Sequence, residues 1–75
     1  MVKAGHSSEE TREALLEAAA EVFAEKGYKG ATTRDIAGRA GMNLASIHYH
    51  FRDKQGIYLA VINSHIEMLQ KAVPL

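Results

Sequence analysis

The sequence predicts an all-α domain built from four helices. Alanine, leucine, glutamate and lysine, which favour helices, are common, and the only proline is Pro74, near the end of the chain. Apolar residues recur at helical spacing in four segments, and each segment follows a serine, threonine, asparagine or aspartate that can cap a helix. The chain of 75 residues has the length of one small domain.

The composition excludes several classes of function. There is no cysteine, so neither a disulfide nor a cysteine-ligated zinc site can form. No apolar run approaches the roughly 20 residues that span a membrane, and the polar first residues do not resemble a signal peptide. The sequence has no glycine-rich phosphate loop, paired-carboxylate motif or nucleophile motif. We therefore expect no enzyme, no cofactor and no membrane partner.

The formal net charge is +0, but the charges are segregated along the chain. Between residues 7 and 26, six glutamates stand against one arginine and one lysine. Between residues 27 and 54, five lysines and arginines stand against two aspartates. Concentrated positive charge favours binding to phosphate groups, so the second segment is the candidate for a nucleic-acid contact.

The first helix is expected to begin after Ser7, because Glu10 follows it at the spacing of a capping box. Gly27 is expected to end this helix. Residues 1–6 are expected to form a disordered tail. The apolar face of the helix consists of Leu15, Leu16, Ala19, Val22 and Phe23.

Two short helices are expected next. The first is capped by Thr32 or Thr33 and ended by Gly41. Only two residues separate Gly41 from the next apolar segment, and the second of them, Asn43, is expected to cap a helix over residues 44–51. Two short helices joined by a short glycine-containing turn are typical of a helix-turn-helix.

The helix over residues 44–51 carries the run His48-Tyr49-His50. At about 100° per residue, Ile47 and Phe51 face the core while Tyr49 points away from it. The two histidines are two positions apart, whereas ligands that converge on one metal ion from a helix are three or four apart. We therefore expect no metal site.

The outer face of this helix also carries the small residues Ala45 and Ser46 and no carboxylate. Close approach, hydrogen-bond donors and the absence of negative charge are what a helix in the major groove of DNA requires. We interpret the face as a DNA-binding surface. A solvated face without a partner is the alternative.

A fourth helix is expected from Lys54 to about Ala72, capped by Asp53 and stopped by Pro74. Its apolar residues cover an arc of roughly 200°, about twice what packing on one small core requires. Part of this arc is expected to cover something beyond the four helices. The alternative is a central helix that the bundle wraps on several sides.

The segments AAAEVFAEKGYKGA and TTRDIAGRAGMNLASIHYHFRDKQGIY closely resemble the N-terminal DNA-binding domain of TetR-type bacterial transcriptional regulators. The resemblance covers residues 12–62, and the segment MNLASIHYHF is most similar to the CecR-type subgroup. The family pattern is Phe-x-x-x-Gly-Tyr, Thr-Thr, Ile-Ala, Ala-Gly and His-Phe with a following lysine. Its members here are Phe23, Gly27, Tyr28, Thr32, Thr33, Ile36, Ala37, Ala40, Gly41, His50, Phe51 and Lys54.

The resemblance implies a homeodomain-like three-helix head over residues 7–53. Over residues 54–75 it implies a connecting helix that leads into an effector-binding and dimerisation domain, which we expect to be missing from this chain. The implied function is sequence-specific binding of double-stranded DNA by a transcriptional repressor of the bacterial cytoplasm and nucleoid. The full-length protein would be a homodimer, with a small-molecule effector bound only by the missing domain. A small helical protein-interaction or dimerisation module that does not bind DNA is the competing hypothesis.

The resemblance also implies which residues contact DNA. The starts of the second and fourth helices meet phosphate, the beginning of the third lies against base edges, and its middle hydrogen-bonds the DNA backbone. In that order the residues are Thr33, Arg34 and Lys54; Leu44, Ala45 and Ser46; and Tyr49 and His50. Asn43 and His48 complete this surface. His48 stands where many family members have tyrosine, and it is able to donate to a phosphate or to a base.

Overall fold

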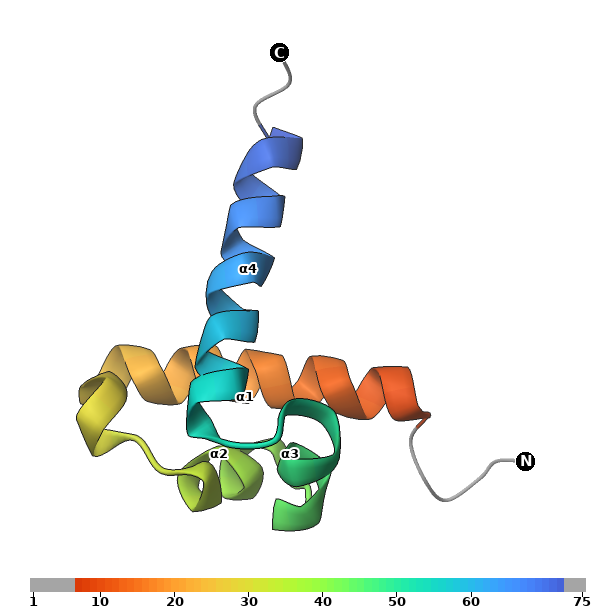
Figure 1. Cartoon of the computed structure of the whole chain (residues 1–75), viewed down its shortest axis with the longest axis vertical. Helices are drawn as coiled ribbons and strands as arrows, with labels where there is room; N and C mark the ends of the chain where they lie inside the picture. Colours follow the sequence, from red (N-terminus) through yellow and green to blue (C-terminus); the bar gives the residue numbers. More distant parts are fainter. Residues whose placement is uncertain (1–6, 73–75) are drawn as a thin grey trace.

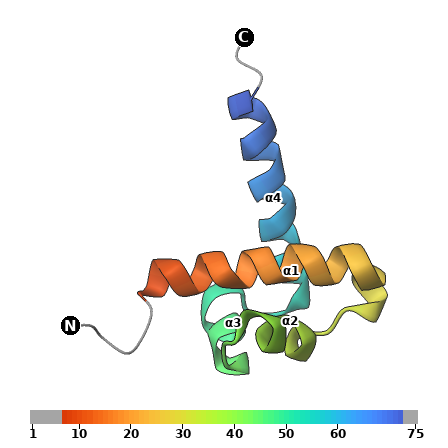
Figure 2. The ribbon, with the colours of Figure 1, turned by 180° about the vertical axis from the view of Figure 1, so that it is seen from behind.

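In the computed structural model, which describes residues 7–72, four α-helices account for nearly all of the described chain. They are α1 (Ser8–Gly30), α2 (Thr33–Ala40), α3 (Leu44–Phe51) and α4 (Lys54–Ala72). Helices α2 and α3 lie together on one side of α1, and α4 passes α1 and rises away on the other side (Figures 1 and 2). The all-α prediction is confirmed. The expectations for residues 1–6 and for Pro74 lie outside the described residues.

The N-terminus of α1 is closed by the predicted capping box. The amide of Glu10 donates to Ser7 Oγ at 3.1 Å, and the amide of Ser7 donates to the Glu10 carboxylate at 3.2 Å. The two bonds pair backbone donors that the first turn of a helix otherwise leaves without acceptors.

The other end of α1 differs from the prediction. Gly27 has φ 74° and ψ 171°, which interrupts the helix as expected, but one further turn runs to Gly30. The amide of Ala31 donates to the Gly27 carbonyl at 3.1 Å and closes this turn. The regular helix therefore ends at Gly27 as predicted, and what differs from the prediction is the added turn across the kink, which extends α1 to Gly30. The extra turn brings the ring of Tyr28 to 4.8 Å from the ring of Tyr58 in α4.

Helices α2 and α3 form the expected helix-turn-helix. Thr32 caps α2, its Oγ accepting from the Asp35 amide at 3.0 Å, and Gly41 ends α2 with φ 70° and ψ 28°. Asn43 occupies the predicted N-cap position of α3, but its side chain makes no capping hydrogen bond. An N-cap side chain normally accepts a hydrogen bond from the second or third amide of the helix. Here the third amide, that of Ser46, donates instead to the Asn43 backbone carbonyl at 2.9 Å.

The core lies where the four helices meet. Ile47 and Phe51, which were predicted to anchor α3, are 0% and 6% exposed, so this prediction is confirmed. Burial of each large apolar side chain contributes about 1.5–3 kcal/mol to folding. The largest fully buried side chains come from all four helices and are Leu15, Val22, Ile36, Ile47 and Ile57.

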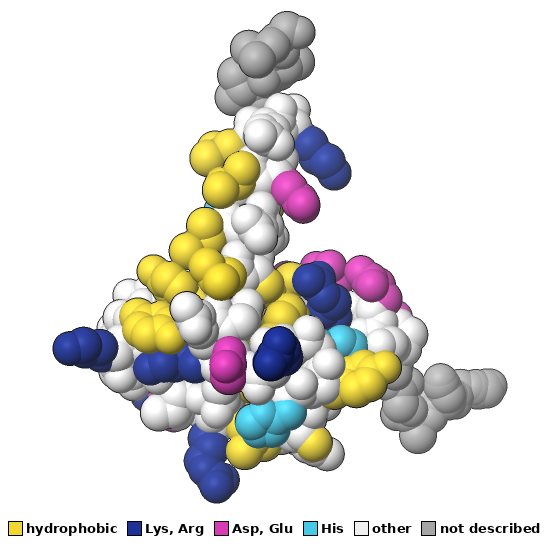
Figure 3. Space-filling view, in the orientation of Figure 1, with side chains coloured by type: hydrophobic (Ala, Val, Ile, Leu, Met, Phe, Trp, Pro, Cys, Tyr) yellow, Lys and Arg dark blue, Asp and Glu magenta, His cyan; other side chains and the backbone are white. Residues whose placement is uncertain are grey.

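Only the first half of α4 packs on this core. Ile57 and Val61 are buried, whereas the apolar residues beyond them are exposed. Apolar side chains follow one edge of the rising helix in Figure 3. The wide apolar arc is confirmed, and the alternative of a central helix is wrong, because nothing in the described chain covers the far half of α4. No helix among residues 7–72 has the length and hydropathy needed to cross a membrane. The most exposed apolar residues of α4 are Leu59, Ile66, Met68 and Leu69.

Candidate nucleic-acid interface

The outer face of α3 has the arrangement that the helical spacing predicts. Tyr49 is 79% exposed, and Ala45 and His48 are also exposed. Because the opposite face of α3 is held in the core, this outer face is presented to solvent without any carboxylate of its own. The remaining expected contact residues of α3 are half-buried and are Leu44, Ser46 and His50.

The two histidines of α3 lie in different surroundings. The ring of His50 contacts the rings of Tyr49 and Phe51, with centroid distances of 4.8 and 6.0 Å. His48 instead contacts the backbone at the end of α3. Within residues 7–72, no three histidine, aspartate or glutamate side chains gather in a way that could hold a metal ion.

The start of α2 opens into a shallow depression that it shares with α3 and α4. Thr32 accepts the amides of Asp35 and Ile36, whereas the amides of Thr33 and Arg34 have no acceptor among the described residues. Free amides at a helix N-terminus attract anions. Three expected DNA-binding residues meet in this depression, which is lined by Ala31, Thr32, Thr33, His48, Asp53 and Lys54.

Lys54 makes contacts that the sequence does not reveal. Its Nζ donates to the carbonyl oxygens of Tyr28 and Ala31, at 2.7 and 3.2 Å, and lies 4.3 Å from the centroid of the Tyr28 ring. An ammonium group has three N–H donors, so one remains for an external acceptor. Lys54 therefore joins the start of α4 to the last turn of α1.

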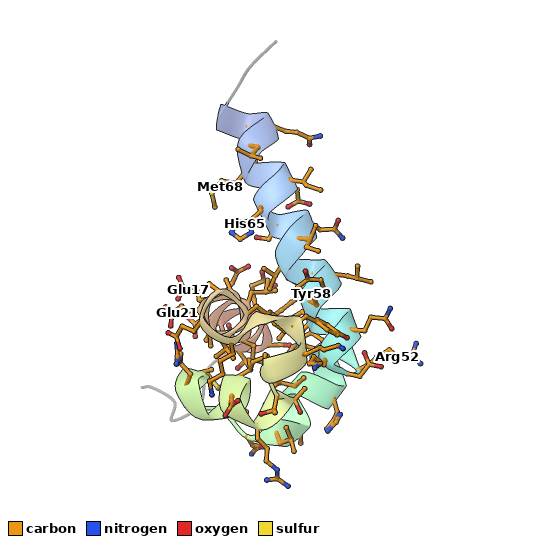
Figure 4. The ribbon with its side chains drawn as sticks, turned by 90° about the vertical axis from the view of Figure 1, so that its left-hand side faces the viewer. Glu17, Glu21, Arg52, Tyr58, His65 and Met68 are labelled. Atoms are coloured by element: carbon orange, nitrogen blue, oxygen red, sulfur yellow. The ribbon has the colours of Figure 1, made fainter. Side chains whose placement is uncertain are left out.

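An aromatic cluster reinforces this joint. The ring of Tyr58 stands edge-on to the rings of Phe23 and Tyr28, at 4.9 and 4.8 Å, and Phe23 stacks on Tyr28 at 5.9 Å. Tyr58 points from α4 toward the end of α1 (Figure 4). Aromatic pairs of this geometry contribute about 0.5–1.5 kcal/mol beyond the area that they bury. The cluster holds α4 to the helix that supports the helix-turn-helix.

Ion pairs on the surface connect α1 with α2. Both terminal nitrogens of Arg39 donate to the Glu25 carboxylate, at 2.6 and 2.8 Å, and one of them lies 3.6 Å from Glu21. Lys26 pairs with Asp35 at 3.2 Å. The hydrogen bond from Arg39 holds the pKa of Glu25 below its ordinary value, and the bond from Lys26 does the same for the pKa of Asp35. The pKa of Arg39 is raised by its bond to Glu25.

These pairs change how the positive charge of residues 27–54 is distributed. The charge of Arg39 is offset by carboxylates of α1, so it adds little to the field over α3. Arg34 and Arg52 have no ion-pair partner within residues 7–72, and Arg52 points away from the head (Figure 4). The sequence places Arg52 just beyond the outer face of α3, but only Arg34 of these two arginines was among the expected DNA contacts.

The junction between α3 and α4 is a three-residue turn centred on Arg52. Arg52 has φ 80° and ψ −57°, and the Asp53 amide donates to the Phe51 carbonyl at 3.0 Å, which makes a γ-turn. A residue other than glycine is strained in this conformation. His48 Nδ1 lies 3.0 Å from the Arg52 carbonyl oxygen. Because a carbonyl oxygen only accepts, Nδ1 must carry the proton of this bond.

Helices α2 and α3 are joined by a glycine-containing turn, and α3 has one buried and one exposed face. This arrangement defines a helix-turn-helix domain. The family model for bacterial regulatory proteins of the TetR family matches residues 15–61. The chain belongs to this family.

Relatives and a solved structure agree with this assignment. The chain is 42% identical over 65 residues to the HTH-type transcriptional activator FasR of Mycolicibacterium smegmatis, covering 87% of this chain and 30% of FasR. It is 35% identical over 72 residues to the HTH-type transcriptional repressor AcnR of Corynebacterium glutamicum, covering 96% of this chain and 38% of AcnR. The crystal structure of HlyIIR, a hemolysin II transcriptional regulator, matches with a TM-score of 0.73 and 38% identity, covering 76% of this chain and 32% of HlyIIR. The chain thus spans about a third of the length of these relatives.

Proposed function

We propose that this chain binds double-stranded DNA in a sequence-specific manner, with α3 in the major groove. The observation that carries the proposal is the outer face of α3, where Tyr49 is 79% exposed and small side chains adjoin it without a carboxylate. The relatives with an HTH-type name support the same reading.

In this proposal the first turn of α3 reads the bases. Ser46 is able to donate to a base edge, while Leu44 and Ala45 offer apolar contact, for instance to a thymine methyl group. Asn43 precedes them with a side chain that is not used for capping. An uncommitted amide at this position supports a contact to a base or to an adjacent phosphate.

The DNA backbone is held on both sides of α3. Thr33 and Arg34, at the start of α2, approach one phosphate with amides and a guanidinium group that have no partner among the described residues. Tyr49 and His50 hydrogen-bond the backbone along α3, and Lys54 offers its third N–H to a phosphate. These contacts fix the register of the head on the duplex.

For the whole regulator we propose the arrangement that the family resemblance implies. Two heads of a homodimer occupy two half-sites, and a small-molecule effector bound by the regulator changes their spacing. The proposed action is repression, as in the name of AcnR, although FasR is named an activator. The proposed location is the bacterial cytoplasm, on the nucleoid. The head itself is proposed to have no catalytic role and no cofactor.

The test is a titration of labelled random-sequence duplex DNA, followed by fluorescence anisotropy at low and moderate salt. We expect the wild-type chain to bind with a dissociation constant of about 10⁻⁴ to 10⁻⁶ M, as a lone head with non-specific contacts does, and to weaken with salt. The variant Arg34→Ala/Tyr49→Ala should lose this binding. The control Lys71→Ala/Ile66→Ala removes one charge and one apolar side chain from the exposed half of α4, and should bind like wild type. A folded wild-type chain that does not bind favours the protein-interaction module.

A further inference from the structure

The hydrogen bond between His48 and the Arg52 carbonyl determines which nitrogen of the imidazole ring carries a proton while the bond is made. The bond requires a proton on Nδ1, so a neutral His48 has a bare lone pair on Nε2. Nε2 is separated from Nδ1 by one ring carbon and points in a different direction, so the bond to the Arg52 carbonyl does not engage it. The side chain of His48 is exposed, and no hydrogen bond to Nε2 is made within residues 7–72.

The depression beside His48 is suited to a phosphate group. On one side it is lined by uncharged residues from the end of α1 and the start of α2, where the amides of Thr33 and Arg34 have no acceptor within residues 7–72. The charged groups that line it come from the start of α4. The Asp53 carboxylate accepts the Gly56 amide at 2.8 Å, and the Lys54 ammonium binds two carbonyls. No lining carboxylate is left without a hydrogen-bond donor.

We propose that His48 is a proton-dependent contact to the DNA backbone, in which a charged ring donates Nε2–H to a phosphate oxygen while it keeps the Nδ1–H bond to Arg52. The inference rests on the proposed function and assigns His48 its role within it. A neutral ring tied through Nδ1–H presents its Nε2 lone pair to the phosphate, and two acceptors repel. A charged ring keeps the bond to Arg52 and gains an N–H donor with a positive charge. DNA binding is therefore coupled to the uptake of one proton.

The coupling of DNA binding to proton uptake requires a histidine at position 48. A tyrosine at the same place would donate its O–H to phosphate at any neutral pH, because a phenol stays protonated to about pH 10. Histidine changes its charge between about pH 5 and 8. A charged His48 ring is thus more favourable to a phosphate in this depression than a neutral one. The ring of His50 contacts two aromatic rings, and His50 has no such bond to the backbone of residues 7–72.

The experiment measures the affinity of the chain for the random-sequence duplex between about pH 6 and 8 at constant ionic strength. For the wild type we expect the affinity to fall as pH rises, by at most about tenfold per pH unit, the limit for uptake of one proton. His48→Gln should bind weakly with little pH dependence. His48→Tyr should bind tightly with little pH dependence. His65→Gln, which removes a histidine from the far half of α4 (Figure 4), should keep the wild-type profile.

The outcomes separate this inference from the proposed function. Salt-sensitive binding that does not change with pH overturns the role of His48 and leaves DNA binding intact. An unchanged pH profile in His48→Gln or His48→Tyr overturns it as well. Absence of binding at every pH overturns the proposed function itself. Circular dichroism of each variant verifies folding, and NMR of the imidazole should show that His48 stays protonated to higher pH in the complex than in the free chain.

Discussion

The ammonium group of Lys54 donates to the carbonyl of Tyr28 at 2.7 Å, although the two residues are 26 positions apart. This bond connects the first residue of α4 with the last turn of α1. Lys54 therefore has a structural role beside the phosphate contact proposed for it, and a substitution can separate the two.

Lys54→Met keeps the aliphatic stem and removes all donors. We expect the free energy of unfolding to fall by about 1 kcal/mol, because two charge-assisted hydrogen bonds are lost at a partly exposed site. The slope of log affinity for DNA against log salt should fall by about one unit. Urea unfolding and anisotropy at several salt concentrations measure the two effects. A lower stability with an unchanged salt slope would remove Lys54 from the phosphate contacts.

Ser46 and Tyr49 are expected to differ in what they contribute to DNA binding. Tyr49→Ala removes a backbone contact and should weaken binding to every sequence by a similar factor. Ser46→Ala removes a base contact and should change which sequence is preferred. The difference in binding free energy between the preferred base and other bases should fall by about 1–3 kcal/mol. Selection from a pool of random duplexes compares the two variants. An equal loss on all sequences for Ser46→Ala would argue against a base contact.

Two glycines should respond in opposite ways to alanine. At Gly56 a Cβ atom would overlap the backbone carbonyl of Phe51, so Gly56→Ala forces α4 away from α3. We expect a loss of about 1–3 kcal/mol in the free energy of unfolding. Gly38, inside α2, has nothing within 4 Å of its Cβ position, so Gly38→Ala should raise stability by up to about 1 kcal/mol. Denaturant unfolding of both variants tests the close contact between α3 and α4.

Arg52 is the single non-glycine residue with positive φ among residues 7–72, at φ 80°. Arg52→Gly should relieve the strain of the γ-turn and stabilise the fold by about 1 kcal/mol relative to Arg52→Ala, which loses the side chain and keeps the strain. Thermal unfolding of the pair isolates the backbone effect, because neither variant retains the guanidinium group. Equal midpoints would show that the turn adopts another conformation.

The Glu25–Arg39 pair should make stability depend on acid. The pKa of Glu25 is lower in the folded chain than its ordinary value of 4.5, because Arg39 donates to the carboxylate. Its contribution is therefore fully present above about pH 4.5 and is lost as pH falls through the folded pKa. Glu25→Gln should flatten the decline of stability with acid. The control Glu17→Gln removes an exposed carboxylate of α1 that has no ion-pair partner within residues 7–72, and should leave the decline unchanged.

The features that sequence reasoning predicted are local. The capping box at Ser7, the left-handed end at Gly41 and the bounds of α3 each depend on residues within four positions of one another. The burial of Ile47 and Phe51 follows from helical spacing alone. The candidate surface of α3 was predictable for the same reason.

The features that were not predicted depend on distant residues. The turn after Gly27 contacts Tyr58 and Lys54 of α4, and no pattern near Gly27 indicates them. Arg39 faces Glu25 of α1 because of how α2 crosses α1, so counting charges along the chain overestimates the field over α3. The bond of His48 to Arg52 depends on a backbone turn with positive φ at Arg52. Such a turn is not predicted from the sequence, because the residue there is not glycine.

The junction between α3 and α4 contains only Arg52 and Asp53. Because this connection is so short, the direction in which the exposed apolar side of α4 faces depends on the number of residues between α3 and α4. One inserted residue would turn that side by about 100° around the helix axis while α3 stayed in place. The junction therefore fixes the orientation, relative to the outer face of α3, of any partner that packs on the outer half of α4.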